Sequence, residues 1–149
     1  MRVVTQNVLR AVLTIDGKII ASIAKGLIWF VGFTQGDDWI RVEKMVDKIF
    51  MMRCLPDAQG KTNRSLTDEQ ASLLVIPNFT LYGSIAEGRR PSFIQALQPS
   101  EAEPLFNYLK DMLKQRWPQT QFGMFGKDMK IDVLNDGPFT MVHDHEDLL

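Results

Sequence analysis

The stretch Leu-Thr-Ile-Asp-Gly-Lys-Ile-Ile at residues 13–20 determines the kind of fold to expect. Two alternating, mostly β-branched segments flank the pair Asp16-Gly17. This pair is the preferred centre of a two-residue type I′ turn, because both positions need a positive φ angle. The sequence therefore predicts an antiparallel β-hairpin near the N-terminus.

The residues around this hairpin continue the same sheet and then change to a helical pattern. A third apolar run, Leu27 to Phe33, follows Lys25-Gly26 and ends before Gly36-Asp37-Asp38. An aspartate there can cap a helix, and apolar residues then recur at spacings of three and four. The predicted helix has a buried stripe formed by Trp39, Val42, Met45, Val46 and Ile49.

The second half of the chain contains another helix and further strands. Residues 57–61 are typical of a turn after a short strand, and residues 72–81 form a strongly apolar run. Ser100 and Glu103 have the spacing of a capping box, which predicts a helix that ends before Pro118. Short strands around Asp136-Gly137-Pro138 complete the pattern. We expect one α+β domain over residues 1–149, a curled antiparallel sheet with two helices packed against it.

Composition restricts the class of protein. The 149 residues carry a formal net charge of −1, with 45% hydrophobic and 23% charged residues, which is typical of a soluble globular domain. The single cysteine, Cys54, excludes an internal disulfide. No apolar run is long enough for a spanning helix and no secretory leader is recognisable, so we expect a cytoplasmic protein without a membrane partner.

The small net charge conceals an uneven distribution. All 17 Lys and Arg residues lie within residues 1–130, whereas five of the 18 acidic residues lie in residues 131–149. An acidic C-terminal segment therefore offsets a mildly basic body. This distribution weakens the argument against a nucleic-acid partner, although it does not predict one.

Few residues offer conventional catalytic chemistry. The two histidines, His143 and His145, could share a face and hold a metal, but a frayed, solvated tail is the better interpretation. Cys54, among methionines and leucine, is expected to be a buried, inert thiol. No nucleophile elbow, phosphate-binding glycine loop or zinc-binding helix motif is present. We expect no metal and no cofactor.

Two unusual backbone segments remain as candidate sites. In residues 75–81, an extended backbone would place Asn78 and Thr80 on one face, and Pro77 would mark an edge, a bulge or an opening of the sheet. A core strand with an edge proline is the simpler interpretation. In residues 135–140, Gly137-Pro138 is either an ordinary turn or a rigid device that holds carbonyl groups in place.

Several motifs together resemble the D-aminoacyl-tRNA deacylase family, long called D-tyrosyl-tRNA deacylases. They are the opening residues 1–11, Gly60-Lys61-x-Asn63, Gly88-x-Arg90-Pro91-Ser92-Phe93, Phe125-x-x-x-Met129 and Asn135-Asp136-Gly137-Pro138-x-Thr140. Each motif alone is weak, but they occur in the family's order and spacing over nearly the whole chain. The sequence is therefore identified as a divergent member.

The resemblance implies a function in translational proofreading. Family members hydrolyse the ester that joins a D-amino acid, or glycine mischarged on tRNA-Ala, to the terminal adenosine of tRNA. They are homodimers with a small β-barrel-like fold, and a Gly-Pro pair from one subunit enters the other subunit's pocket and rejects L-amino acids. Gly137 and Pro138 correspond to that pair. The catalytic strand motif corresponds to residues Pro77, Asn78, Phe79 and Thr80, and the adenosine pocket to Leu81, Phe125 and Met129.

The implied chemistry explains the missing catalytic side chains. An aminoacyl ester is already activated, the ribose 2′-hydroxyl assists water, and backbone N–H groups of the strand motif stabilise the developing oxyanion. Thr80 could instead act as a covalent nucleophile, but its motif contains no base to activate it. A positioning role for Thr80 is therefore the better interpretation.

Three departures from the family pattern leave the substrate open. Asn7 stands where most members have Arg, and Pro77-Asn78 stands where Ser-Gln is usual. Pro77 has no N–H to donate, and the Asn78 side chain is one methylene shorter than Gln. A relaxed-chirality deacylase of L-alanyl-tRNA, as in an animal sister group with this proline, and a non-catalytic protein that binds the tRNA end are the alternatives.

The basic body offers candidate contacts to tRNA phosphates. These are Lys25, Arg89, Arg90, Lys110, Lys114 and Arg116. For each of them alone, a solvated surface charge is the simpler interpretation.

Overall fold

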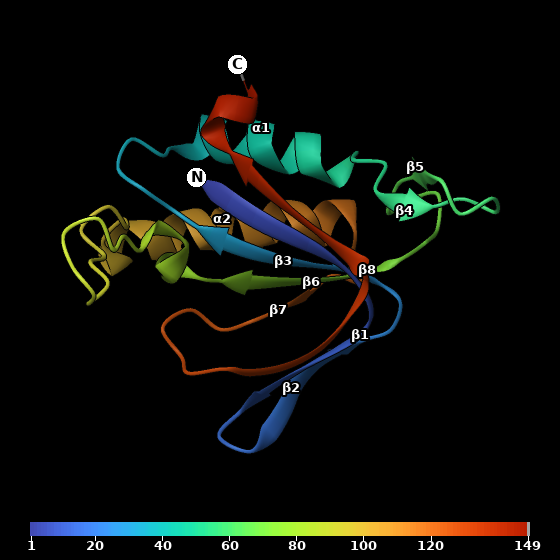
Figure 1. Cartoon of the computed structure of the whole chain (residues 1–149), viewed down its shortest axis with the longest axis horizontal. Helices are drawn as coiled ribbons and strands as arrows, with labels where there is room; N and C mark the ends of the chain where they lie inside the picture. Colours follow the sequence, from blue (N-terminus) through green and yellow to red (C-terminus); the bar gives the residue numbers. More distant parts are fainter. Residues whose placement is uncertain (149) are drawn as a thin grey trace.

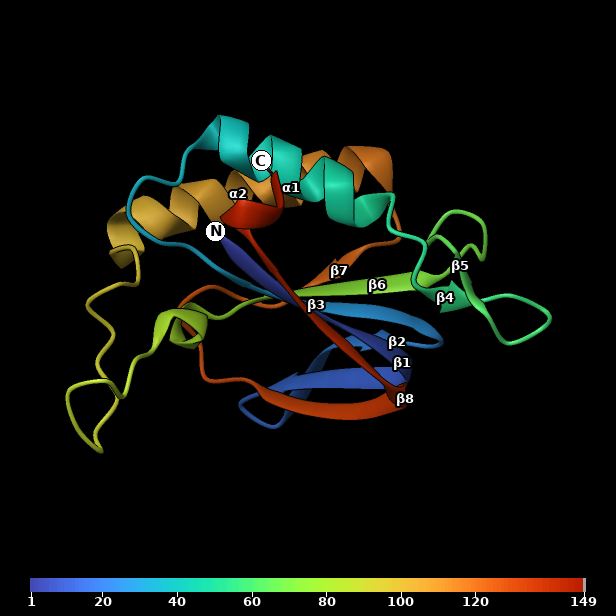
Figure 2. The same cartoon turned by 45° about the horizontal axis from the view of Figure 1, so that its top comes forward.

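A six-stranded sheet that curls on itself carries two helices on one face (Figures 1 and 2). The computed structural model describes residues 1–148, so Leu149, the last residue of the predicted domain, lies outside it. The sheet strands are β1 (Arg2–Ile15), β2 (Lys18–Ile23), β3 (Gly26–Gly32), β6 (Ser72–Pro77), β7 (Gln121–Phe122) and β8 (Lys130–Asp144). A separate two-stranded ribbon consists of β4 (Leu55–Pro56) and β5 (Thr62–Arg64).

The N-terminal hairpin is confirmed. β1 and β2 pair antiparallel, with Ile15 opposite Lys18. Asp16 and Gly17 have φ angles of 49° and 75°, as a type I′ turn requires. The turn between β4 and β5 is confirmed as well, since the Asp57 side chain accepts hydrogen bonds from the N–H groups of Gln59 and Lys61, both at 2.9 Å.

The sheet is mixed rather than wholly antiparallel as predicted. Its order is β2-β1-β3-β6-β7, and β8 pairs with the free side of β1. β3 and β6 run parallel because the chain between them crosses over through a helix, and β7 is parallel to β6 for the same reason. The side chain of Gln121 donates to and accepts from the backbone of Ser22, which joins β7 to β2 and nearly closes the curl.

The two predicted helices are present, with differences at their first turns. α1 (Trp39–Phe50) begins at Asp38, which accepts a hydrogen bond from the Arg41 N–H, and its stripe is buried except for Trp39. α2 (Pro99–Arg116) begins one residue before the predicted capping box, because Pro99 takes the first helical position and Ser100 the second. Ser100 therefore cannot serve as the cap.

Two apolar clusters form the core. One lies between the sheet and the helices and includes Trp29, Val42 and Phe106. The other fills the inside of the curl and includes Leu13, Ile28 and Leu74. Cys54 is buried, as expected, and burial raises the pKa of its thiol to about 11, so the thiol stays neutral and unreactive.

The C-terminal segment is a long strand and not a frayed tail, so that interpretation of the histidines was wrong. β8 pairs with β1 almost from end to end, since Arg2 pairs with Asp144. His143 is only 9% exposed, and its Nε2 lies 3.1 Å from Thr5 Oγ1. His145 lies in a 3₁₀ turn, η2 (His145–Leu148). Within residues 1–148 no cluster of metal-binding side chains occurs.

The segment around Gly137-Pro138 interrupts β8 without dividing it into short strands. Gln6 pairs with Thr140, and Val8 pairs with Asn135. One β1 residue, Asn7, therefore faces four β8 residues, which we call the excursion (residues 136–139). Gly137 and Pro138 are exposed and their peptide bond is cis.

Stability is expected to fall when His143 must accept a proton. Burial lowers its pKa below the ordinary 6.5, although Asp147 nearby opposes this shift. Above pH 6.5 both the folded and the unfolded chain carry a neutral imidazole. Below it the unfolded chain binds a proton that the folded chain does not, so the free energy of unfolding decreases as the pH falls from 6.5 toward the folded-state pKa.

Urea unfolding between pH 7.5 and 5 measures this effect. The His143→Gln variant, which cannot titrate, should lose less stability over this range than the wild type. Parallel curves for the two proteins would contradict the prediction.

No helix within the described residues is both long and apolar enough to cross a membrane.

Candidate functional site

The apolar run at residues 72–81 contains two conformations. β6 ends at Pro77, and residues Phe79–Tyr82 form a 3₁₀ turn, η1. Asn78 lies between them, with φ −147° and ψ 90°. The expectation of one extended strand with alternating faces is therefore wrong, whereas Pro77 does mark the point where the sheet opens. A proline cannot continue a ladder that needs its N–H, so the chain turns away there.

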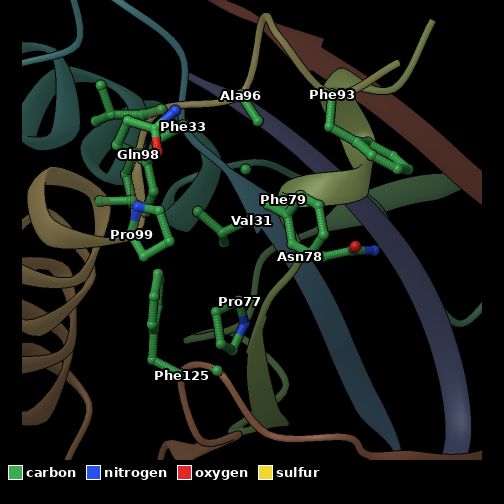
Figure 3. Close-up of a pocket in the computed structure, with 14 residues that line it drawn as sticks. Val31, Phe33, Pro77, Asn78, Phe79, Phe93, Ala96, Gln98, Pro99 and Phe125 are labelled. Carbon is green, nitrogen blue, oxygen red and sulfur yellow. The ribbon is translucent and has the colours of Figure 1, made fainter. Parts of the chain in front are cut away.

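A cavity of about 330 Å³ lies where β3, β6 and the start of α2 meet (Figure 3). It has a mainly apolar wall. Figure 3 shows Pro77 and Phe125 at one end and Phe79 with Phe93 at the other, while Pro99 and Gln98 lie across from them. The Asn78 amide is directed away from Phe125 and Pro99, so polar groups lie at the rim. The cavity thus suits a flat, apolar group with a polar extension.

The backbone of the strand motif offers two free donors. The Asn78 N–H is already used, since it donates to the Val31 carbonyl oxygen at 2.7 Å, and Pro77 has none. Phe79 and Thr80 begin η1, so their N–H groups have no intrahelical acceptor, and they bond to no other group in residues 1–148. Any oxyanion at this rim would therefore meet the N–H groups of Phe79 and Thr80.

The Thr80 side chain acts on its neighbour. Its hydroxyl donates to Asn78 Oδ1 at 2.5 Å. This contact fixes the Asn78 amide so that its NH₂ group faces outward as a donor. Of the residues described, no histidine, carboxylate or lysine bonds to the Thr80 hydroxyl, so nothing in the chain activates it as a nucleophile.

Arg2 holds η1 in place. Its guanidinium donates to the Leu81 carbonyl oxygen at 2.8 Å, pairs with the Asp144 carboxylate at 2.6 Å, and lies 4.8 Å from the centre of the Tyr82 ring. Burial alone would raise the pKa of Asp144, but hydrogen bonds from Arg2 and His145 bring it below its usual value. Asp144 is therefore a carboxylate at neutral pH, and Arg2 links it to η1.

Arg2 and Phe93 also belong to the candidate site, although the sequence patterns assigned neither of them to it. Phe93 packs edge to face on Phe79 with ring centres 5.1 Å apart. It belongs to a loop that is held to the end of β3, where the Leu97 N–H donates to the Phe33 carbonyl oxygen at 2.9 Å. Both residues lie inside motifs that carried the family resemblance, so the signal was present, but spacing alone assigned them no contact.

Two of the proposed pocket residues lie beside the cavity and not in its wall. Leu81 approaches β3, since its Cβ would lie 3.2 Å from a Cβ placed on Gly32. Met129 lies near Pro77, because a Cβ on Gly123 would be 2.9 Å from Met129 Sδ and 3.3 Å from Pro77 Cδ. Of the pocket residues proposed from the sequence, Phe125 lines the cavity itself.

The excursion is remote from the cavity of its own chain. η1 touches Arg2 at the start of β1, whereas the excursion faces Asn7. Five residues of strand separate them by about 17 Å, at a rise of about 3.3 Å per residue. In Figures 1 and 2 the bend of β8 lies at the right of the molecule and η1 at the left. Gly137 and Pro138 therefore cannot enter the cavity of the same chain.

The six candidate phosphate contacts do not form one patch. Arg116 pairs with Asp47, and Lys110 lies over the Phe122 ring, at 5.7 Å from its centre. Arg89 and Arg90 lie in a loop that Ser84 and Ser92 close by pairing, next to Phe93 of the cavity. Lys25 precedes Gly26, which pairs with Val8, and therefore lies at the same end as the excursion.

Comparison with solved structures defines the fold class. A structure described as c-Myc DNA Unwinding Element Binding Protein superposes with a TM-score of 0.90 at 32% identity, over 97% of this chain and 98% of that one. A probable eukaryotic D-amino acid tRNA deacylase has the same fold, with a TM-score of 0.85 at 14% identity over 95% and 97% of the two chains. The nearly closed sheet with two helices is therefore the deacylase fold.

Sequence comparison gives the family. The model of D-Tyr-tRNA(Tyr) deacylase matches residues 4–144. D-aminoacyl-tRNA deacylases from Clostridium acetobutylicum and Clostridium kluyveri are 42% and 44% identical, over 97% and 98% of both chains. One from Thermomicrobium roseum is 40% identical over 99% of this chain and 96% of its own. The chain belongs to the D-aminoacyl-tRNA deacylase family of enzymes, as its motifs predicted.

Proposed function

We propose that this protein hydrolyses the ester bond of D-aminoacyl-tRNA and thereby removes D-amino acids, and glycine mischarged on tRNA-Ala, before translation uses them. The observation that carries this proposal is the cavity beside η1, which combines an apolar wall with two unpaired backbone N–H groups at its rim. Family membership over the whole chain supports the same activity. The substrate also argues for a cytoplasmic location.

The arrangement suits a substrate that brings its own reactive groups. The terminal adenine fits against Phe125 and Pro77, and the aminoacyl ester then lies at the rim. Water, assisted by the ribose 2′-hydroxyl, attacks the ester carbon, and the bond to the 3′-oxygen breaks. The N–H groups of Phe79 and Thr80 stabilise the negative charge that develops on the carbonyl oxygen. No side-chain nucleophile is needed.

We further propose that chirality is tested across a homodimer. Gly137 and Pro138 are exposed on an excursion about 17 Å from their own cavity, which supports their use in the cavity of a second copy. An L-amino acid would then direct its side chain at this backbone and be excluded. Lys25, at the same end of the molecule, would reach the same tRNA as Arg89 and Arg90 of the other copy.

A deacylation assay separates the candidate functions. Release of labelled amino acid is followed with D-Tyr-tRNA, Gly-tRNA-Ala, L-Ala-tRNA and L-Tyr-tRNA. Cleavage of the first two but not the L-substrates supports the proposal. Preferential cleavage of L-Ala-tRNA would instead favour the relaxed-chirality alternative, which Pro77 keeps open. Binding of tRNA without cleavage of any ester would identify a non-catalytic binding protein.

The Thr80 hydroxyl is expected to matter modestly. Thr80→Val removes one hydrogen bond to Asn78 and should lower kcat/KM for D-Tyr-tRNA about fivefold, because one such bond contributes on the order of 1 kcal/mol. Thr80→Ser keeps the hydroxyl and should retain most of the rate. A covalent nucleophile would instead cost on the order of 10⁶-fold in kcat, so a complete loss in Thr80→Val would contradict the positioning role.

Salt dependence tests the contacts to tRNA. Each phosphate contact that is lost should reduce the slope of log affinity against log salt by about 1. Arg89→Ala and Arg90→Ala are expected to show this reduction. Arg116→Ala should leave the slope unchanged, since Arg116 is occupied by Asp47. If the Arg89 and Arg90 variants kept the wild-type slope, the loop would not be a phosphate contact.

A further inference from the structure

The side chain of Asn135 spans the base of the excursion in β8. Asn135 precedes the excursion and pairs with Val8, and Phe139 ends it. The Asn135 side-chain Nδ2 donates to the Asn7 carbonyl oxygen at 2.9 Å and to the Phe139 carbonyl oxygen at 3.2 Å. Both hydrogens of the amide are thus used, one toward β1 and one across the excursion.

The other side-chain contacts around the excursion do not span its base. Gln6 Nε2 donates to Thr140 Oγ1 at 3.2 Å, which joins β1 to the residue after the excursion only. The Asn7 side chain is directed into the core, where its Nδ2 donates to the Cys54 carbonyl oxygen at 2.8 Å. It therefore reaches the excursion through its backbone carbonyl alone. Phe139 packs its ring partly against the helix-facing core, which anchors the far end. Gly137 has a φ of 131°, and Pro138 is exposed, so neither fixes its own position by packing.

We propose that Asn135 is the positioning residue for the Gly137-Pro138 pair, and that its amide determines how sharply the enzyme rejects L-aminoacyl groups. This inference rests on the proposed function of the pair. The amide fixes the separation between the two ends of a four-residue excursion, and the ends determine where the exposed pair projects. Without the amide the pair keeps its residues but loses a defined position, and a steric filter discriminates only as well as it is placed.

The test compares an isosteric change at Asn135 with the same change elsewhere. Asn135→Asp keeps the shape of the side chain but replaces the donating NH₂ group with an oxygen that faces two carbonyl oxygens. Asn107→Asp makes the same change on the exposed face of α2, away from the site. The measured quantity is the ratio of kcat/KM for D-Tyr-tRNA to that for L-Tyr-tRNA. Pro138→Ala is measured in parallel to test the pair itself.

The ratio is expected to fall at least about tenfold in Asn135→Asp, as the loss of two hydrogen bonds implies. Most of this fall should come from a rise in kcat/KM for L-Tyr-tRNA. Asn107→Asp should keep the wild-type ratio. Hydrogen exchange should rise at the amides of residues 137, 139 and 140 in Asn135→Asp while the rest of β8 remains protected. This local change also shows that the variant is folded, and Asn135→Ala provides a second variant.

Each result has one meaning. If Pro138→Ala lowers the ratio and both Asn135 variants leave it unchanged, the role of Asn135 is wrong and the proposed function of the pair stands. If neither Pro138→Ala nor the Asn135 variants change the ratio, the pair is no filter, and the inference fails with it. A rise in exchange along the whole of β8 would show that Asn135 merely stabilises the strand, which also overturns the proposal.

Discussion

Gly32→Ala is expected to lower the rate of D-Tyr-tRNA deacylation about 100-fold, because η1 is proposed to orient the substrate and a displacement of about 1 Å in such a segment has an effect of that order. A Cβ on Gly32 would lie 2.8 Å from the Asn78 carbonyl oxygen and 3.2 Å from Leu81 Cβ. Gly32 has no positive φ angle, so the effect is one of space alone. Neither neighbour can give way without moving η1, which carries the two free N–H groups.

The measurement is single-turnover deacylation together with thermal unfolding. The Tm should fall modestly, since one extra carbon in a packed region costs about 1–3 kcal/mol. Ser100→Thr also adds a single carbon, but on the exposed first turn of α2, and should retain the wild-type rate. A Gly32→Ala variant with an unchanged rate would show that the position of η1 does not control catalysis.

Trp29→Ala is expected to cause a large loss of stability, about 3–5 kcal/mol, as for other large aromatic side chains removed from a core. Trp29 lies in the middle of β3, opposite Thr5 on one neighbouring strand and Val75 on the other, and is 1% exposed. Its removal leaves a void between the sheet and both helices. The same strand carries Val31 and Gly32 to the cavity, so activity should fall with stability.

Trp39, in the first turn of α1, is the matched control for this change. Trp39 is 47% exposed and packs edge to face on Tyr108 with ring centres 5.1 Å apart. Trp39→Ala should cost only about 1 kcal/mol, the value of such an aromatic pair. Urea unfolding at pH 7.5 measures both variants. Similar losses for the two would contradict the assignment of Trp29 to the core.

Local rules were sufficient for the elements whose signals are local. The positive φ angles that Asp16-Gly17 prefers gave the hairpin, and Asp38 with the spacing of Val42, Val46 and Ile49 gave α1. The predicted cap at Ser100 was wrong because a capping box and a proline at the first helical position compete within two residues, and Pro99 takes that position. The parallel pairing of β3 and β6 depends on a crossover of about 40 residues, which no local pattern encodes.

Family motifs predicted some of the residues that line the candidate cavity, but contacts between distant segments could not be predicted from the sequence. Pro77, Asn78, Phe79 and Phe125 do line one cavity. That the Asn78 N–H is occupied by Val31 follows from the pairing of β6 with β3, which the sequence does not express. His143 was misplaced for the same reason, because its burial depends on Thr5 of β1, at the other end of the chain.

The distance between the cavity and the excursion has a genetic consequence. In the proposed homodimer each site takes its cavity from one copy and its Gly-Pro pair from the other. A chain with Gly32→Ala and a chain with Pro138→Ala would each assemble two defective sites. Co-expressed, they form mixed dimers in which one site receives an intact cavity and an intact pair while the other site receives both defects. Two alleles that each fail alone should therefore complement each other, restoring selective activity to one site of each mixed dimer.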